Sequence, residues 1–410
     1  MRLLLPLRDG RVARLWSALA LSAIGDQLYT VAMGWVAVGV FGAAAGYLSA
    51  VRAAIILLAA FFGGSLMDRW NRQASMVGAD LARAAALLLL VLAWAIMGAP
   101  TGTTLALTVL VLAIGDSVFG PALQTVLPLL APRDILPATN GLFDATARVA
   151  RLLGPGLVAA LGASLAPIHF FTLDALSFLA SAAAVAGLRL PRTLQPSAAA
   201  PGVRTGWWPS MLAGFRETRR HKPLGFALDM SGLINGAWFT LFYLALPLLL
   251  VARADGLARY GLIMACYGIS NLLANLIVGS RPMSPRPGRQ ILCGIGFLGA
   301  GMVAIAAIAG LDLGADAQAL ALAAASCLAG FGGPLEDIPV ATLRQLLIPT
   351  DTIAGATRAA QIVSNLGTLV AMLLAPAACV AFGPVAVMWV CGLIYVGVTG
   401  YGLAIGLARQ

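Results

Sequence analysis

The feature that most constrains this chain is a series of apolar stretches that recurs from residue 14 to the C-terminal end. Each is about 20 residues or longer, enough for a helix to cross the ~30 Å hydrocarbon core of a bilayer. The strands of a membrane barrel would alternate in polarity, so helices are the spanning element. Only 10% of the residues are charged and 60% are hydrophobic, which excludes a water-soluble surface. The chain is therefore an all-α membrane protein, and the recurrence excludes a single cleavable signal peptide.

Counting the stretches predicts twelve transmembrane helices. The predicted spans are 14–40, 46–67, 74–98, 104–130, 139–164, 168–188, 223–251, 259–280, 289–311, 317–347, 357–382 and 384–407. An even number of spans places both ends of the chain on one side of the membrane. Arginines concentrate in the segments on that side, above all in 189–222, so the positive-inside rule predicts that both termini are cytoplasmic.

Several classes of function are disfavoured by composition. The net charge of +10 reflects topology, and no basic patch interleaved with aromatic residues suggests binding to nucleic acid. The five cysteines fall in or beside predicted spans without a CxxC pair, which argues against disulfides and a metal site. No Gly-rich phosphate loop and no Ser/His/Asp set occurs, so we expect neither ATP use, nor an enzyme, nor a cofactor. Arginine greatly outnumbers lysine, which suggests a GC-rich bacterial genome.

The chain divides into two similar halves. Residues 189–222 are basic and rich in proline, and they predict a cytoplasmic linker between an N-terminal bundle of six helices, 1–188, and a C-terminal bundle of six, 223–410. The segment 119–140 resembles 331–357, since each has Gly-Pro within a span followed by a Pro-x-Asp turn. Internal repeats of this kind build transporter folds, in which the substrate path lies between the halves.

The loop after the second span reads "GGSLMDRWNR" and contains Gly64, Asp68, Arg69 and Arg72. This pattern resembles the loop signature of the major facilitator superfamily. Further segments look like the branch that contains macrolide-efflux and enterobactin-exporter proteins; they are "IGDQL", "ADLARA", "PALQTVLPLL", "RVARLLGPGL" and "LDALSFLAS". The resemblance covers the whole chain and implies the major facilitator fold, with two pseudo-symmetric six-helix bundles.

The resemblance also implies a conformational latch. In the family the loop after span 2 locks the two halves in the outward-facing state. We therefore assign a latch to the four residues of that loop, with Arg358 at the start of span 11 as a partner. Asp80 and Arg83, three residues apart on span 3, extend this cytoplasmic network. The alternative is that the loop arginines only anchor the topology.

Charged residues inside the spans are the candidate site residues, because each costs about 2.5 to 3.5 kcal/mol at the centre of a membrane helix. The resemblance implies that spans 1, 2, 4, 5, 7, 8, 10 and 11 line a central cavity. We assign proton coupling to Glu336, Asp337 and Asp26, and substrate binding to Tyr29, Arg52, Asp116, Arg151, Asn235, Trp238 and Tyr243. The alternative is structural: the acids and arginines, including Asp144 and Arg148, pair within the N-terminal bundle, and the aromatic residues simply pack.

Glu336 and Asp337 follow a Gly-Gly-Pro break in span 10, where few cations match them. One interpretation is that Pro334 begins a new half-helix, whose positive first turn the two acids stabilise. The other is that at least one carboxylate faces the cavity without a cation, where it gains and loses a proton or binds a cationic substrate. The sequence leaves these alternatives open.

Together the residues and the resemblance predict a monomeric secondary transporter in a bacterial inner membrane, which exports an amphipathic small molecule, a drug or siderophore-like metabolite, in exchange for protons. Its expected partners are this substrate, protons and the lipid bilayer. A transporter with the same fold could instead carry its substrate inward, as a symporter for a nutrient or an iron-siderophore complex, or act as a lysolipid flippase. A membrane sensor is a further alternative.

Overall fold

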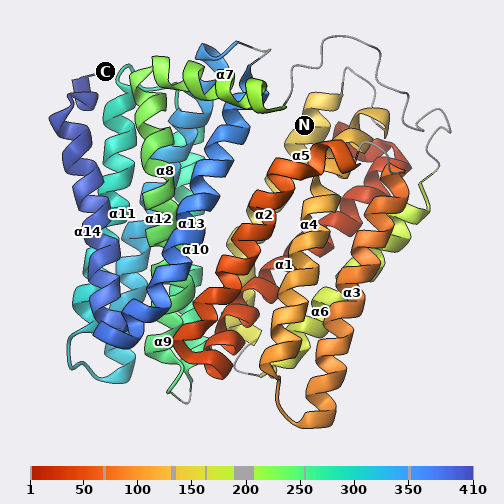
Figure 1. Cartoon of the computed structure of the whole chain (residues 1–410), viewed down its shortest axis with the longest axis horizontal. Helices are drawn as coiled ribbons and strands as arrows, with labels where there is room; N and C mark the ends of the chain where they lie inside the picture. The colour runs from red at the N-terminus through yellow and green to blue at the C-terminus, as the bar shows by residue number, and fades with distance from the viewer. Residues whose placement is uncertain are drawn as a thin grey trace. The chain divides into compact units, whose positions relative to one another are not determined.

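The computed structural model describes residues 2–67, 71–130, 135–161, 164–188, 207–253, 255–349 and 352–409. The described chain is helical from end to end (Figure 1). It divides into two compact units, the first comprising Met1–Val40 and Ile55–Gly202, and the second Phe41–Ala54 and Val203–Gln410. The predicted domain limits at 188 and 223 stay predictions.

The first unit is built from long helices that follow a short 3-10 helix, η1 (Arg2–Arg8). They are α1 (Gly10–Phe41), the later part of α2 (Gly46–Met67), α3 (Arg72–Met97), α4 (Gly102–Leu130), α5 (Leu136–Leu161) and α6 (Pro167–Ala186). Helix α3 packs against both α4 and α6.

The second unit contains the remaining helices and a short segment, η2 (Gly42–Ala45), which packs on α13. They are α7 (Trp207–Arg220), α8 (Lys222–Thr240), the π-helical turn η4 (Leu241–Ala245), α9 (Leu246–Leu250), α10 (Gly256–Gly279), α11 (Pro287–Ala309), α12 (Ala315–Leu347), α13 (Ile353–Phe382), α14 (Pro384–Ala404) and η5 (Leu407–Arg409). Helix α12 packs between α10 and α11, and α13 packs between α7 and α8.

The long helices follow the predicted spans closely. Helix α3 covers Arg72–Met97 where 74–98 is predicted, and α12 covers Ala315–Leu347 where 317–347 is predicted. Within the described residues, ten stretches are long and apolar enough to cross a membrane. The first of them, Gly10–Phe61, joins α1 and α2 in one run, and α5 is not among the ten. The chain is therefore a multi-pass membrane protein, and the number twelve stays a prediction.

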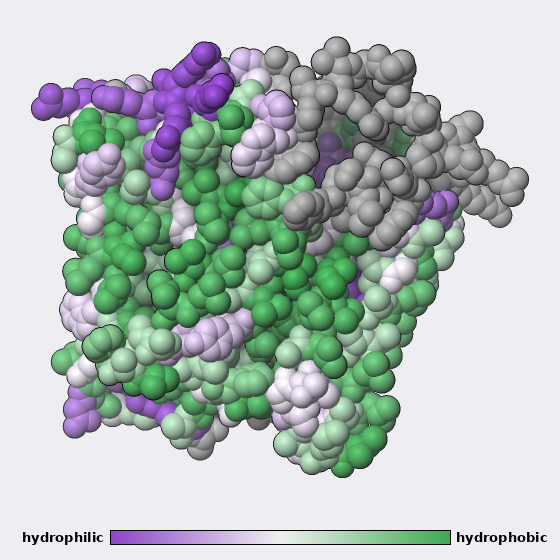
Figure 2. Space-filling view, viewed as in Figure 1, coloured by the Kyte–Doolittle hydropathy of each residue, from purple (hydrophilic) through white to green (hydrophobic). Residues whose placement is uncertain are grey.

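One helix was not predicted. Helix α7 lies in the segment 189–222, which the sequence analysis treats as a linker. It packs on α13, where a Cβ atom added to Gly214 would lie 2.1 Å from the amide nitrogen of Ala356. Hydrophilic residues gather at the end of the second unit where α7 lies, and broad hydrophobic surface covers the flanks of the long helices (Figure 2). This distribution is typical of helices that stand in a bilayer.

Helix ends follow local chemistry. Asn71 caps α3, because its side chain accepts a hydrogen bond from the amide of Ala74 at 3.1 Å. Gly98 ends the same helix with φ of 76°, a left-handed conformation that glycine adopts without steric cost. Gly383, with φ of 82°, separates α13 from α14, and Pro384 begins α14 at a position where no amide hydrogen is needed.

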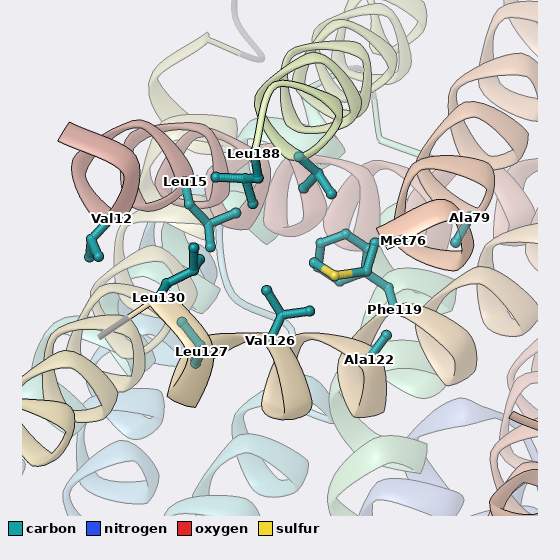
Figure 3. Packing of buried hydrophobic residues seen from close by; sticks show 11 residues of the cluster. Val12, Leu15, Met76, Ala79, Phe119, Ala122, Val126, Leu127, Leu130 and Leu188 are labelled. Carbon is teal, nitrogen blue, oxygen red and sulfur yellow. The ribbon is translucent and has the colours of Figure 1, made fainter. Parts of the chain in front are cut away.

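Apolar side chains fill one end of the first unit, where α1, α3, α4 and α6 meet (Figure 3). Val12 and Leu15 of α1 lie beside Leu127 and Leu130 of α4, and Met76 of α3 lies next to Phe119 of α4. All six side chains are buried. This cluster fixes α3 and α4, which carry the charged residues described below.

Helices α8 and α13 of the second unit cross at a pair of glycines. A Cβ atom added to Gly367 would lie 2.1 Å from the carbonyl oxygen of Gly232 and 2.3 Å from its carbonyl carbon. Only glycine permits this approach, since real Cβ atoms do not come within 3.0 Å of backbone. The crossing brings the polar residues of α8 and α13 to the same side.

We predict that Gly367→Val lowers the free energy of unfolding by about 1–3 kcal/mol or more, because the added side chain forces the two backbones apart. Gly397→Val in α14 is the matched control, since a Cβ atom there meets nothing within 4 Å. Thermal unfolding of both variants in detergent measures the difference. Equal stability of the two variants would contradict the close crossing.

Candidate functional site

A polar cavity of about 310 Å³ lies within the second unit, among α7, α8, α12 and α13. Its polar lining residues are Thr218, Ser231, Asn235, Glu336, Asp337, Arg344, Thr357, Gln361, Ser364 and Asn365. The volume is in the range of small-molecule sites, which combine an enclosed space with a few placed polar groups. Both acids that the sequence analysis assigns to proton coupling line this cavity, as does Asn235.

A second cavity, of about 340 Å³, lies between α3 and α4 of the first unit. Small and aliphatic residues such as Gly78, Ala82 and Val111 line it, and its lining contains no charged side chain. An apolar groove on lipid-facing helices has nothing with which to orient a polar ligand. The cavity in the second unit is therefore the candidate site.

The two carboxylates of the candidate site differ in their interaction partners. Asp337 and Arg344 lie seven residues apart on α12 and interact electrostatically. Asp337 is thus not the unmatched charge that one reading of the sequence expects. Glu336 is half-buried and makes no hydrogen bond or ion pair with any of the described residues. Two carboxylates face one guanidinium, so the cavity has an excess of acid.

Helix α12 is continuous through the Gly-Gly-Pro sequence, so the predicted alternative of a half-helix beginning at Pro334 is wrong. Pro334 has no amide hydrogen to donate to the carbonyl of Gly330, four residues earlier. The side-chain amide of Asn271, from α10, donates to that carbonyl instead, at 3.1 Å. The helix continues because a neighbouring side chain replaces the lost hydrogen bond.

The glycines around Pro334 serve close packing. A Cβ atom added to Gly330 would lie 2.2 Å from the carbonyl oxygen of Tyr267 on α10. One added to Gly332 would lie 2.4 Å from the carbonyl oxygen of Gly294 on α11. The two neighbouring helices therefore hold α12 from both sides, and this fixes where Glu336 emerges into the cavity.

The aromatic residues of α8 and η4 form a packed cluster with α10. Trp238 donates a hydrogen bond from its indole nitrogen to the hydroxyl of Tyr267 at 3.0 Å, and its ring lies 5.0 Å from that of Phe239 and 5.5 Å from that of Tyr243. Trp238 and Tyr243 are not among the residues that line the 310 Å³ cavity. In this structure they pack with each other, and their assignment to substrate binding stays a prediction.

Three charged residues of the first unit form one network around the buried Arg83. Arg83 on α3 pairs with Asp80 of the same helix and donates to Asp116 on α4 at 2.8 Å. Its guanidinium also lies over the rings of Phe119, at 4.9 Å, and Phe178, at 4.2 Å. We predict a role for Asp116 in substrate binding and one for Asp80 and Arg83 in the latch, and the structure brings all three together.

The other predicted residues of the first half are placed as follows. Asp26, Arg52, Arg72 and Arg151 each take part in an interaction, and Tyr29 packs edge-on against Phe171 with ring centroids 6.0 Å apart. Gly64 lies in α2, and Arg358 is half-buried in α13. Asp68 and Arg69 lie outside the described residues, as do the side chains of Asp144 and Arg148. The latch therefore stays a prediction.

Sequence reasoning missed several residues that the structure brings to sites. Gln361, Ser364 and Asn365 of α13 line the cavity, and their spacing of three and four on one helix face would have indicated a polar stripe. No sequence pattern identifies Asn271, because its role as donor to the Gly330 carbonyl arises only from the packing of α10 beside Pro334. Asp174 stood in a motif that the sequence analysis quotes, yet its role was not assigned.

These features define a class: a multi-pass helical membrane protein with a polar, small-molecule-sized cavity among its helices. Residues 15–372 match the family model of the Major Facilitator Superfamily. The chain belongs to this superfamily and is a membrane transporter of its type, which implies a small-molecule substrate. The finer resemblance to the macrolide-efflux and enterobactin-exporter branch stays a prediction.

Solved structures share the fold at low sequence identity. The nucleoside transporter NupG is similar with a TM-score of 0.73 and 13% identity, over 96% of this chain and 98% of that one. A bacterial homologue of the iron transporter ferroportin is similar with a TM-score of 0.68 and 15% identity, over 95% and 98%. A bacterial homologue of the human lysosomal transporter Spinster follows with 0.64 and 16%, over 99% and 98%. None of the curated proteins matches the chain.

We predict that Asn271→Leu lowers the free energy of unfolding by about 1–3 kcal/mol, because it leaves the buried Gly330 carbonyl without a donor. In a Pro334→Ala background the same change should cost less, since the new amide at 334 donates to that carbonyl. A double-mutant cycle of unfolding free energies measures the coupling. Costs that are equal in the two backgrounds would contradict the replacement of the lost backbone bond by Asn271.

Proposed function

We propose that this transporter exports an amphipathic small molecule, a drug or a siderophore-like metabolite, in exchange for protons. The observation that carries the proposal is the acid-rich cavity, in which Glu336 lacks a partner among the described residues while amide and hydroxyl groups of α8 and α13 surround it. An acid in such a place can bind a proton or the cationic part of a substrate, and the two then compete.

The mechanism follows from this competition. Alternating access opens the binding site to one side of the membrane at a time, and the occupant of the site determines which state is favoured. A substrate bound at Glu336 and Asp337 stabilises the state that carries it outward. Protons that enter from outside then neutralise the two carboxylates, displace the substrate, and allow the empty carrier to return.

The proposed setting is a bacterial inner membrane, with twelve spans in two six-helix bundles and both termini in the cytoplasm. The surplus of arginine in the predicted cytoplasmic segments supports this orientation. The proposed exchange of substrate for protons needs no second subunit, so we propose that the transporter is a monomer. The first unit contributes the latch loop after α2, whose pairing with the start of α13 is part of the same proposal.

We predict that Glu336→Gln and Asp337→Asn each lower the affinity for an amphipathic cation by about tenfold or more, because a charged hydrogen-bond partner contributes about 1.5–3 kcal/mol. Both variants should also lose the pH dependence of ligand stabilisation. Thermal shift of the purified protein with a panel of amphipathic dyes, macrolides and siderophores, at several pH values, measures both effects. Asp316→Asn is the control, since its side chain is 94% exposed at the start of the same helix.

Uptake into everted vesicles tests the direction of transport. An exporter accumulates substrate in such vesicles while the proton gradient is maintained, and uptake stops when an uncoupler collapses the gradient. Uptake that appears only in right-side-out vesicles would establish an importer instead. Undiminished pH dependence in both acid variants would contradict the assignment of Glu336 and Asp337.

A further inference from the structure

Many polar side chains that line the 310 Å³ cavity have already used a hydrogen-bond donor within their own helix. Each of four donates to a backbone carbonyl three or four residues earlier, at distances between 2.7 and 3.0 Å. Such local bonds are a common alternative for Ser, Thr and Asn side chains in helices. The four residues are Thr218 of α7, Ser231 and Asn235 of α8, and Asn365 of α13.

These local bonds decide what the four side chains still offer to a ligand. A hydroxyl has one hydrogen, so Thr218 and Ser231 are left with lone pairs and can only accept. In Asn235 and Asn365 the atom beside the backbone carbonyl must be Nδ2, because a carbonyl oxygen cannot donate. Oδ1 of each asparagine has no hydrogen bond within the described residues, and each Nδ2 keeps one further hydrogen. Together the four groups therefore offer more acceptors than donors.

The other polar lining residues increase this excess of acceptors. Glu336 makes no hydrogen bond or ion pair within the described residues, and an ionised carboxylate only accepts. Gln361 and Ser364 also make no side-chain hydrogen bond there, and each can donate or accept. The guanidinium of Arg344 interacts with Asp337. Arg344 follows Glu336 by eight residues on α12, about 12 Å along a helix, so a cation beside Glu336 is well separated from it.

The acceptors of α8 are held in place by close packing. A Cβ atom added to Gly232 would lie 3.0 Å from the carbonyl oxygen of Val363, and one added to Gly236 would lie 2.8 Å from that of Gly367. Ser231 and Asn235 each precede one of these glycines, so the contact of α8 with α13 fixes their positions. Fixed acceptors select a ligand by the positions of its donors, because they do not rearrange to suit another.

The rest of the lining suits an apolar group. Leu224 and Leu228 of α8 and Val340 of α12 line the same cavity. A fitting ligand therefore combines an apolar body with a cationic head that carries several N–H groups. A quaternary ammonium has the same charge but no N–H, so it would leave the acceptors without donors, and unpaired polar groups in an enclosed site cost affinity.

We propose that the substrate of this cavity is an amphipathic amine or guanidine with at least two N–H donors on its cationic head. The oxygens of Asn235 and Asn365 select it over a quaternary ammonium of the same shape, and Glu336 selects it over an uncharged molecule. The inference rests on the proposed function in taking this cavity as the transport site. It adds the class of substrate and the residues that discriminate.

Calorimetric titration of the purified protein with phenylbutylamine and with its N,N,N-trimethyl derivative, at one fixed pH, tests the proposal. We expect the primary amine to bind about tenfold more tightly or better, because only it supplies N–H donors. Asn235→Leu and Asn365→Leu should each lower this ratio by about threefold or more, since each removes an acceptor of similar volume.

Thr368→Val is the matched control for the asparagine variants. Thr368 lies on α13 like Asn365 and also donates to a backbone carbonyl four residues earlier, that of Ser364, at 3.1 Å. It is buried and does not line the cavity. The variant should therefore keep the ratio of the unmodified protein.

Equal affinity for the two cations in the unmodified protein overturns the proposal, as does tighter binding of the trimethyl derivative or no binding of either. This comparison needs no variant, so it decides even if an asparagine variant fails to fold. A ratio that stays unchanged in both asparagine variants overturns their assignment. Proton-driven uptake of the trimethyl derivative as fast as that of the amine would contradict this inference alone. Selective binding of the amine without any proton-dependent uptake would support it and contradict the proposed function.

Discussion

The cost of placing charge and unpaired backbone in hydrocarbon governs this structure. Arg83 could not lie in α3 without Asp80 and Asp116 beside it, nor without the rings of Phe119 and Phe178 over its guanidinium. In the second unit, Arg259 at the start of α10 pairs with Asp255 and Asp316. Charged side chains that are neither paired nor near a surface are rare under this constraint, so Glu336 is the place where function is to be sought.

The same constraint explains the two proline positions next to α10. Pro334 removes a hydrogen bond from the Gly330 carbonyl, and Asn271 replaces it. Pro247 follows the π-helical turn η4, where the carbonyl of Phe242 accepts from the hydroxyl of Tyr260 at 3.0 Å. In both cases α10 supplies the donor, so the proline positions in α9 and α12 depend on one neighbouring helix. A backbone carbonyl that loses its donor inside a membrane helix needs such a replacement.

The sequence predicted the helices well, because their signal is local: about twenty apolar residues have few alternatives to a membrane helix. Helix α7 was not predicted from the sequence, because it is short, amphipathic and surrounded by polar sequence. The sequence also identified Glu336, Asp337 and Asn235, which line the cavity. It could not reveal Asn271 as the donor to the Gly330 carbonyl, nor the close approach of Gly25 to Asp174, since these depend on which helices become neighbours. The interruption proposed at Pro334 was wrong for the same reason.

The claim that most of this account depends on is that water fills the cavity of the second unit. Cysteine labelling on a variant without the five native cysteines tests it most directly. Ser364→Cys faces the cavity, and Leu366→Cys lies two residues away on the same helix with half of its side chain on the outer surface. A charged thiol reagent requires an ionised, hydrated thiol, so it should modify the first position rapidly and the second hardly at all. Equal rates, or faster reaction at 366, would contradict an aqueous cavity around Glu336 and Asp337.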